Sequence, residues 1–187
     1  MKTIQEIYQI VEESSHETAF NFGECEALYN CLIQLPDFAR VVEIGVQFGR
    51  SATVIAEVGK EKGFEFTAVD NWLEEYSQRA LPHFEAQIAK HGWEIKKMWM
   101  DSSLASKIYE GKIDLIHIDG DHEYEGVLSD IKHWLPKIKR GGFALFDDYG
   151  HDSLPGIWKA CNEYFSEHKN WKFLGRYGNK LGVYQKI

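Results

Sequence analysis

The fold is indicated first by the segment Val41-Val42-Glu43-Ile44-Gly45-Val46-Gln47-Phe48-Gly49-Arg50-Ser51-Ala52. A short apolar run ends at Gly45, and a segment with helical spacing begins just after Gly49. Glycine at both ends of this turn lets the backbone approach a ligand closely, and the helix that follows offers free N–H groups to an anion such as a carboxylate. The spacing departs from G-x-G-x-x-G, which counts against a dinucleotide pyrophosphate site. A turn that needs glycine only for its geometry remains the alternative.

The same alternation of strand-like and helix-like segments continues along the chain. We predict the clearest helix from Tyr124 to Ile138, where apolar residues recur every third or fourth position. Alternation with short connections indicates parallel strands joined by crossover helices. The expected parallel strands are Val41–Gly45, Phe64–Asp70, Ile95–Met100, Ile113–Asp119 and Gly142–Asp147.

The last segment of the chain breaks this rhythm. Trp171–Tyr177 and Leu181–Gln185 flank Gly178-Asn179-Lys180, a short connection typical of an antiparallel hairpin. The sequence therefore predicts one α/β domain over residues 1–187. N-terminal helices within residues 1–38 precede a core of residues 39–187, in which a mainly parallel sheet is closed by the antiparallel pair.

Composition excludes several classes of protein. Hydrophobic residues make up 44% and aromatic residues 14% of the chain, enough for a packed core and too many for a disordered chain. The net charge of −8 disfavours nucleic-acid binding. No apolar run is long enough to cross a membrane, and the N-terminus is polar and acidic, so we expect a cytoplasmic protein. Three cysteines, Cys25, Cys31 and Cys161, form no C-x-x-C pair and are expected as buried thiols.

Polar residues stand at the ends of the second and third predicted strands. Asp70, followed by Asn71 and Trp72, ends the second strand where a nucleoside-binding fold places an acid that binds ribose hydroxyls. Asp101 and Ser102 follow the third strand. Each aspartate alone is as readily explained as a helix N-cap. Taken together with the glycine turn, they favour a site for a nucleoside-bearing cofactor whose other end is a small anion.

A second group of acids follows the fourth and fifth strands. Asp119 comes after the fourth strand, and Asp147 and Asp148 come after the fifth. Three carboxylates brought together repel one another unless a cation or protons intervene, and oxygen ligands suit Mg²⁺, Mn²⁺ or Ca²⁺. His122 lies three residues beyond Asp119 and is a candidate general base. The alternative for the acids is that they are helix caps and part of a solvated turn. The alternative for His122 is that it caps the helix that begins near Tyr124 or lies in solvent.

These motifs resemble those of class I S-adenosylmethionine-dependent methyltransferases. Glu43–Ala52 (EIGVQFGRSA) is similar to the cofactor loop of the small metal-dependent O-methyltransferases of the catechol and caffeoyl-CoA type. Asp119–Val127 (DGDHEYEGV) and Leu135–Tyr149 (LPKIKRGGFALFDDY) resemble bacterial relatives that modify sugars and antibiotics. The resemblance implies a Rossmann-like three-layer α/β sandwich with a seven-stranded, mostly parallel sheet. It also implies methyl transfer from S-adenosyl-L-methionine to a hydroxyl of a small molecule, assisted by a divalent cation such as Mg²⁺.

The resemblance also assigns roles to individual residues. It places the methionine end of the cofactor at Asn21, Phe22, Gly23, Glu43, Gly45, Gln47, Gly49 and Ser51. It places the ribose at Asp70, and the adenine at Asn71, Trp72, Asp101 and Ser102. It assigns Asp119 to both the cofactor and the metal, and Asp147 and Asp148 to the metal. It implies that Asp119 and His122 are the catalytic residues. His122 stands where plant and animal enzymes carry a lysine proposed as the base, and Asp147-Asp148 replaces their Asp-Asn pair.

Other functions remain open at this point. A metal-dependent hydrolase or hydroxylase would use the acid cluster without a nucleoside site. A non-catalytic protein that binds an adenosyl ligand would keep the cofactor residues without turnover. A nicotinamide oxidoreductase is disfavoured by the glycine spacing. For partners, we expect a small-molecule hydroxyl acceptor, no nucleic acid and no membrane, and a homodimer is left open.

Overall fold

The structure, a computed structural model, describes residues 1–14, 20–73 and 75–187. Its helices are α1 (Ile4–Ser14), α2 (Phe22–Ile33), α3 (Arg50–Lys62), α4 (Glu75–His91), α5 (Ser102–Ile108), α6 (Tyr124–Trp134), the 3₁₀ turn Leu135–Lys137, and α7 (Pro155–Glu167). Its strands are β1 (Arg40–Ile44), β2 (Glu65–Asp70), β3 (Ile95–Trp99), β4 (Ile113–Ile118), β5 (Ile138–Phe146), β6 (Trp171–Tyr177) and β7 (Leu181–Lys186).

The strands form one seven-stranded sheet in the order β3-β2-β1-β4-β5-β7-β6. Strands β1 to β5 pair in parallel, and β7 pairs antiparallel with both β5 and β6. The predicted Rossmann-like sheet with its C-terminal hairpin is therefore confirmed. Strand order reverses between β1 and β4, which is where an open α/β sheet leaves a crevice at the carboxyl ends of its strands.

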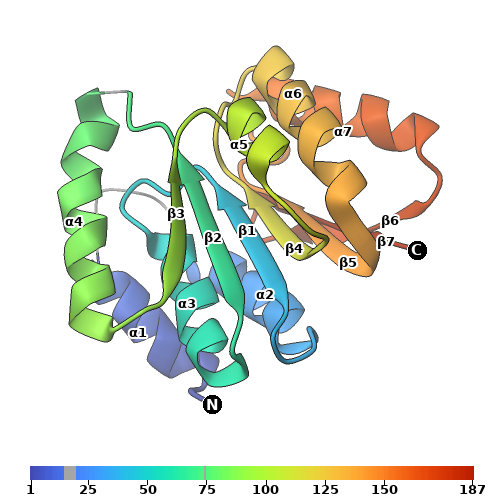
Figure 1. Cartoon of the computed structure of the whole chain (residues 1–187). Coiled ribbons are helices and arrows are strands. Elements are labelled where there is room, and N and C mark those ends of the chain that lie inside the picture. Colours follow the sequence, from blue (N-terminus) through green and yellow to red (C-terminus); the bar gives the residue numbers. More distant parts are fainter. Residues whose placement is uncertain (15–19, 74) are drawn as a thin grey trace.

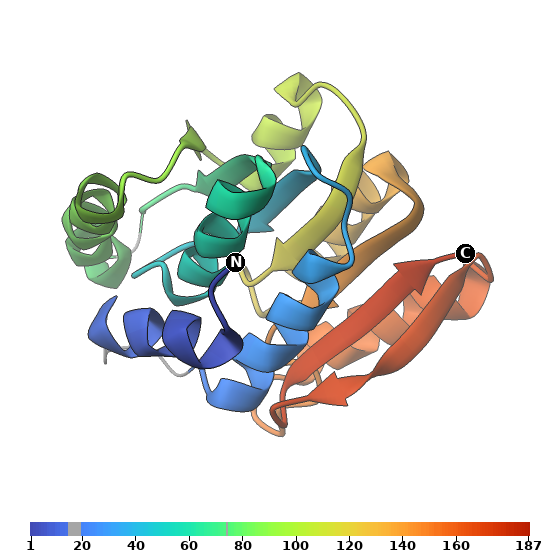
Figure 2. The same ribbon diagram turned by 90° about the horizontal axis from the view of Figure 1, so that it is seen from below.

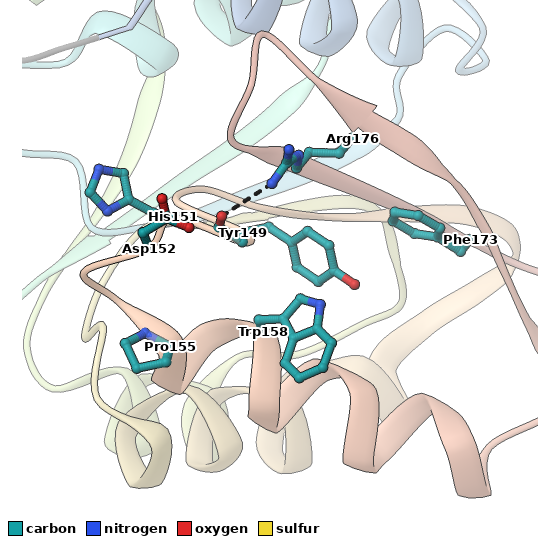
Figure 3. A pocket seen from close by; sticks show the side chains of 8 residues that line it. Tyr149, His151, Asp152, Pro155, Trp158, Phe173 and Arg176 are labelled. Atoms are coloured by element: carbon teal, nitrogen blue, oxygen red, sulfur yellow. Dashed lines mark hydrogen bonds between the residues drawn. The ribbon is translucent and has the colours of Figure 1, made fainter.

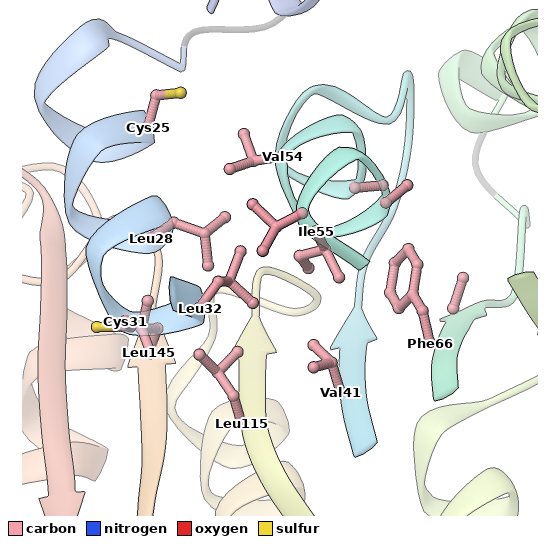
Figure 4. Packing of buried hydrophobic residues seen from close by; sticks show 14 of the residues in the cluster. Cys25, Leu28, Cys31, Leu32, Val41, Val54, Ile55, Phe66, Leu115 and Leu145 are labelled. Carbon is pink, nitrogen blue, oxygen red and sulfur yellow. The ribbon is translucent and has the colours of Figure 1, made fainter. Parts of the chain in front are cut away.

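Helices cover both faces of the sheet (Figures 1 and 2). On one face, α1 to α4 bury the first hydrophobic cluster, in which Leu28 and Leu32 of α2 meet Leu115 and Leu145 of the sheet (Figure 4). On the other face, α5 to α7 bury a second cluster around Ile116, Ile131 and Trp134. Strands covered on both faces read as continuous apolar runs, which is why β4 and β5 could be recognised in the sequence.

Two predicted boundaries differ from the structure by more than one residue. The helix expected to reach Ile138 ends at Trp134, because Pro136 cannot donate a helical hydrogen bond and the chain tightens into a 3₁₀ turn. The fifth strand begins at Ile138 instead of Gly142. Its pairing with β4 is interrupted by an irregularity, at which Gly141 takes a left-handed φ of 84°.

The remaining expectations on packing concern the cysteines and the membrane. All three cysteines are buried and free, as predicted. Among the described residues, no helix has the length and apolar character needed to cross a bilayer.

Candidate functional site

The carboxyl ends of the neighbouring strands β2, β1, β4 and β5 form one row. The residue after each of the last three strands continues the hydrogen bonding of the sheet to its neighbour. Gly45 N donates to Val69 O (2.9 Å), Asp119 N to Ile44 O (2.8 Å), and Asp147 N to Ile118 O (3.0 Å). The sheet therefore brings the glycine turn and the acids that follow β4 and β5 to one edge, as the sequence predicts.

The turn between β1 and α3 requires both of its glycines. Gly45 has a φ of 79°, and a Cβ placed there would lie 2.0 Å from the carbonyl oxygen of Asp119. Gly49 has a φ of 80°, and its Cβ would lie 2.3 Å from Phe84. Between them, Gln47 also has a positive φ of 44°. Gly49 is the N-cap of α3 and has no side chain that could cap its first turn, in which Ser51 lies buried.

Asp70 ties the end of β2 to this turn. Its Oδ2 accepts hydrogen bonds from the backbone N–H of Val46 (2.8 Å) and Gln47 (3.1 Å), and its Oδ1 accepts from Trp72 N (2.9 Å). The alternative that Asp70 caps a helix is wrong, because its contacts go to the turn and to Trp72, and α4 begins only at Glu75.

The two residues after Asp70 differ in their surroundings. Asn71 is exposed and accepts a hydrogen bond from Leu73 N (3.1 Å). Trp72 is buried, has a φ of 54° and packs edge-on against Trp99 at 5.2 Å between ring centroids. Its indole N–H is fully buried and has no hydrogen-bond partner among the described residues. A bulky residue at positive φ with an unused buried donor is a strained feature of the kind found at binding sites.

Asp101 and Ser102 have structural partners. Asp101 is the N-cap of α5 and accepts from Ser103 N (2.9 Å) and Leu104 N (3.1 Å), which is the capping alternative left open by the sequence. The Ser102 hydroxyl donates to the buried Asp130 of α6. Burial raises the pKa of Asp130 to about 6.

Glu43 lies inside the sheet, away from solvent. It is fully buried on β1 and pairs with His117 Nδ1 on β4 at 3.0 Å. Burial alone would lower the pKa of His117, but the hydrogen bond and charge of Glu43 raise it above its ordinary value. Within the described ranges, Glu43 Oε2 and His117 Nε2 have no hydrogen-bond partner. The pair therefore supports the floor of the site below the strand ends.

Three donor atoms converge beyond β4 and β5. One ligand atom each from Asp119, His122 and Asp148 lie within 4.8 Å of one another. His122 Nε2 is 3.5 Å from Asp119 Oδ1 and 3.5 Å from Asp148 Oδ2. Burial and the neighbouring Asp147 raise the pKa of Asp119 to about 7, and the contact with Asp119 raises the pKa of His122.

Asp147 lies outside this group of three. Its side chain is 5% exposed, and its Oδ2 accepts from Lys180 Nζ at 3.1 Å, which is also 3.0 Å from Asp148 Oδ1. Burial alone would lower the pKa of Lys180, but Asp147 and the other nearby carboxylates raise it, so the ammonium stays charged. Asp147 Oδ1 is buried, and no described residue forms a hydrogen bond with it.

The start of α2 closes the site from the other side. Asn21 caps this helix in a reciprocal capping box with Glu24, and its Nδ2 donates to Gly178 O in the hairpin turn (2.7 Å). Gly23 also packs against the turn, since a Cβ on it would lie 2.9 Å from Gly178 Cα. Phe22 is 37% exposed and packs edge-on against Tyr8 at 5.2 Å.

A pocket of about 520 Å³ opens beside Asp148, between the β5–α7 loop, α7 and β6 (Figure 3). Tyr149 is buried at its centre, with the half-exposed rings of Trp158 and Phe173 on either side. Arg176 donates to Gly150 O at 3.1 Å, and no carboxylate of the described residues pairs with it. Asp152 lies on the rim of the same pocket.

Several of these residues were missed from the sequence. His117 was missed, although Glu43, which the sequence did single out, lies opposite it in the register of β1 and β4, and two polar residues on buried strands were the available signal. Lys180 carried no signal, because a lysine after a turn is normally exposed. Glu24 looked like an ordinary residue of the first turn of α2.

Comparison with known proteins identifies the family. A family model described as a methyltransferase domain matches residues 42–149. The rhamnosyl O-methyltransferase of Mycobacterium tuberculosis is 28% identical over 158 residues, which cover 76% of this chain and 62% of that protein. The uncharacterized protein y4gI of Sinorhizobium fredii is 28% identical over 151 residues, covering 74% of this chain and 16% of that protein. The aligned regions thus span less than two thirds of either relative.

Solved structures share the fold. The Podospora anserina methyltransferase PaMTH1, solved with SAH bound, matches with a TM-score of 0.71 at 15% identity, covering 98% of this chain and 87% of that one. The O-methyltransferase NovP matches with a TM-score of 0.70 at 15% identity, covering 87% and 78%. The solved structures show the fold, and the family match favours a methyltransferase over the hydrolase, hydroxylase and oxidoreductase alternatives.

Proposed function

Because the chain belongs to the class I S-adenosylmethionine-dependent methyltransferases, we propose that it transfers a methyl group to a hydroxyl oxygen of a small molecule. The observation that carries this proposal is the contact between the two halves of the site. The turn at Gly45 packs against the carbonyl of Asp119, so a cofactor held over β1 and an acceptor held over β4 and β5 would meet at neighbouring strand ends.

The residues at the β1–α3 turn fit an S-adenosylmethionine molecule. The N–H groups at the start of α3, where the N-cap Gly49 has no capping side chain, suit the methionine carboxylate, and the positive φ values of Gly45 and Gly49 give the turn the tight shape that presents these groups. The Asp70 carboxylate offers about four acceptor positions. Three are used by backbone N–H groups, which leaves capacity for a ribose hydroxyl. The unused indole N–H of Trp72 is a further donor for the adenine end.

The group Asp119, His122 and Asp148 fits a divalent cation. Ligand atoms that lie about 2.1 to 2.3 Å from one ion are about 3 to 3.5 Å apart. The His122 contacts of 3.5 Å match this spacing and are long for hydrogen bonds. When bound, the cation would lower the pKa of the acceptor hydroxyl. The protein's own part is to hold the acceptor oxygen in line with the methyl group and to keep the three ligand atoms together.

His122 has two proposed roles that exclude each other. The sequence suggested His122 as a general base, a role that needs a free Nε2. In the structure that nitrogen faces Asp119 and Asp148, and its raised pKa makes the metal-free imidazole a weaker candidate for proton removal near neutral pH. The geometry therefore favours His122 as a metal ligand.

The pocket around Tyr149 is proposed to hold the part of the acceptor that lies away from the reacting hydroxyl. Aromatic rings stack on the faces of planar or sugar rings, and the arginine and aspartate at the rim suit a neutral polar ligand. The rhamnosyl O-methyltransferase relative makes sugar hydroxyls the first acceptors to test.

The proposal is tested in two steps. Calorimetry should detect binding of S-adenosylmethionine and S-adenosylhomocysteine. Transfer of labelled methyl groups should then be assayed over a panel of glycosides and catechols, with and without Mn²⁺ or Mg²⁺. Product methylated on oxygen would support the function, and the carbon chemical shift of the transferred methyl group, measured by NMR, should distinguish it from methylation on nitrogen. A protein that binds neither cofactor form at millimolar concentration would contradict the proposal.

A further inference from the structure

The hairpin turn that carries Lys180 is fixed in place by its own backbone. Gly178 and Asn179 have φ values of 56° and 79°, and Lys180 N donates to Tyr177 O at 3.1 Å, which are the features of a type I′ turn. The carbonyl of Lys180 in turn accepts from Tyr149 N at 2.6 Å. The base of the lysine side chain is thus held on both sides.

The turn is also clamped against α2. Asn21 Nδ2 donates to Gly178 O, and a Cβ on Gly178 would lie 2.5 Å from Glu24. The ammonium of Lys180 has little choice of position, since its side chain is 17% exposed and lies beside two acids that are less exposed. Its place between Asp147 and Asp148 is therefore built into the fold.

Lys180 divides the acids of the site into two kinds. One carboxylate oxygen of Asp148 pairs with Lys180 and the other faces His122. One oxygen of Asp147 pairs with Lys180, and the other is buried without a partner in the part of the chain that the structure describes. The sequence predicted a ligand set of three carboxylates. In the structure, the atoms that converge are two carboxylate oxygens and one imidazole nitrogen.

We propose that Lys180 determines which divalent cations this site accepts, because it holds Asp147 out of the ligand set. The inference rests on the metal site of the proposed function. Imidazole nitrogen suits transition-metal ions, while Mg²⁺ and Ca²⁺ prefer oxygen ligands and more negative charge. With Lys180 in place, the site binds Mn²⁺ in preference to Mg²⁺. Without Lys180, Asp147 becomes available as a ligand and the site loses one positive charge. The preference for Mn²⁺ over Mg²⁺ therefore becomes smaller.

The test measures binding of Mn²⁺ and Mg²⁺, each alone, by calorimetry on chelator-treated full-length protein. Lys180→Met should raise Mg²⁺ affinity by about tenfold or more and raise Mn²⁺ affinity less, since a positive charge beside the site is removed and a carboxylate is freed. Lys172→Met is the matched control, because it removes an exposed lysine from β6 of the same hairpin and should change neither affinity.

Asp147 supplies the second arm. In the wild-type background, Asp147→Asn should leave Mn²⁺ affinity within about threefold, whereas in the Lys180→Met background it should cancel the gain in Mg²⁺ affinity, a coupling measured as a double-mutant cycle. Where Lys180→Met does not fold without metal, Lys180→Gln keeps a donor and tests the loss of charge. Its melting temperature should rise more with Mg²⁺ than that of the wild type.

Each outcome decides the proposal. Loss of Mn²⁺ binding in the single variant Asp147→Asn would show that Asp147 is a ligand and would overturn the proposal. Unchanged Mg²⁺ affinity in both Lys180 variants would also overturn it. A wild type that binds neither ion, beside a Lys180→Met variant that binds Mg²⁺, would uphold the role of Lys180 and remove the metal from the proposed function. If no variant binds either ion, the inference fails while methyl transfer can still be assayed.

Discussion

A single carboxylate, that of Asp70, joins two parts of the proposed cofactor site. Its two oxygens accept hydrogen bonds from the turn after β1 and from Trp72, so it shapes the turn that would receive the methionine end while it stands where ribose hydroxyls would bind. Removal of the carboxylate should therefore weaken cofactor binding in two ways at once.

Asp70→Ala should lower the affinity for S-adenosylhomocysteine by about 1–3 kcal/mol, the range for hydrogen bonds to a charged group. Asp70→Asn should lose less, because its amide oxygen still accepts from one side of the turn. Calorimetry on both variants checks the order. Glu110→Ala, which removes an exposed carboxylate before β4, at the opposite end of the strands, serves as the control. If the wild type, Asp70→Ala and Asp70→Asn bind S-adenosylhomocysteine with equal affinity, Asp70 has a structural role alone.

His122→Ala separates the two roles of the imidazole. As a metal ligand, His122 should be needed for Mn²⁺ binding, and turnover and the calorimetric Mn²⁺ signal should fall together while cofactor affinity stays unchanged. As a general base it would lose about 10²-fold in turnover, keep Mn²⁺ binding, and recover at high pH. We expect the first result. His133→Ala, which removes an exposed histidine from α6, should behave as the wild type.

At this scale the sequence predicted the residues that end parallel strands, because neighbouring parallel strands bring their carboxyl ends to one edge. Asp119 and Asp148 were found in that way. The pattern could not show that Asp147 faces Lys180, since the side of the strand end to which each carboxylate turns depends on the neighbouring hairpin. Asp101 was predicted at the adenine, which stays a prediction, and the structure shows that it caps α5.

At the scale of elements, the hairpin β6–β7 and the start of α2 act as a pair. They are far apart in the sequence, and Asn21 joins them by capping α2 and donating to Gly178 O. Each element was recognisable from its own residues, the helix from its apolar stripe and the hairpin from its turn. Their contact was not predictable, because local patterns do not specify which helix end faces which turn.

Asn21→Ala should remove the N-cap of α2 and the bond to the hairpin, and should lower the free energy of unfolding by about 1–2 kcal/mol. Chemical denaturation measures this loss. Asn30→Ala is the matched control on the same helix, since Asn30 is exposed and alanine is a better helix former, so it should cost nothing. A loss in the control equal to that of Asn21→Ala would assign the effect to the helix in general and not to the cap.

The whole molecule carries an unusual set of buried acids. Burial raises the pKa of Glu24 to about 7 and of Asp130 to about 6, and it raises that of Asp119 to about 7 together with the charge of Asp147. In an unfolded chain these groups lose their protons near pH 4. The folded protein therefore binds more protons than the unfolded chain between about pH 4 and 7, so its stability falls as the pH rises through this range.

The metal-free protein should accordingly be more stable at pH 5 than at pH 7.5, by a few kcal/mol as an order of magnitude. His117 and His122, whose pKa values are also raised, act in the same direction, and His91, whose pKa is lowered by burial, acts against it. Guanidinium denaturation at the two pH values gives the difference.

Asp130→Asn should reduce this difference in stability, since the amide does not titrate while its oxygen can still accept the hydrogen bond from Ser102. Asp152→Asn, an exposed acid, should leave the difference unchanged. Stability that rises from pH 5 to 7.5 in the wild type would mean that these carboxyls are ionised in the folded state.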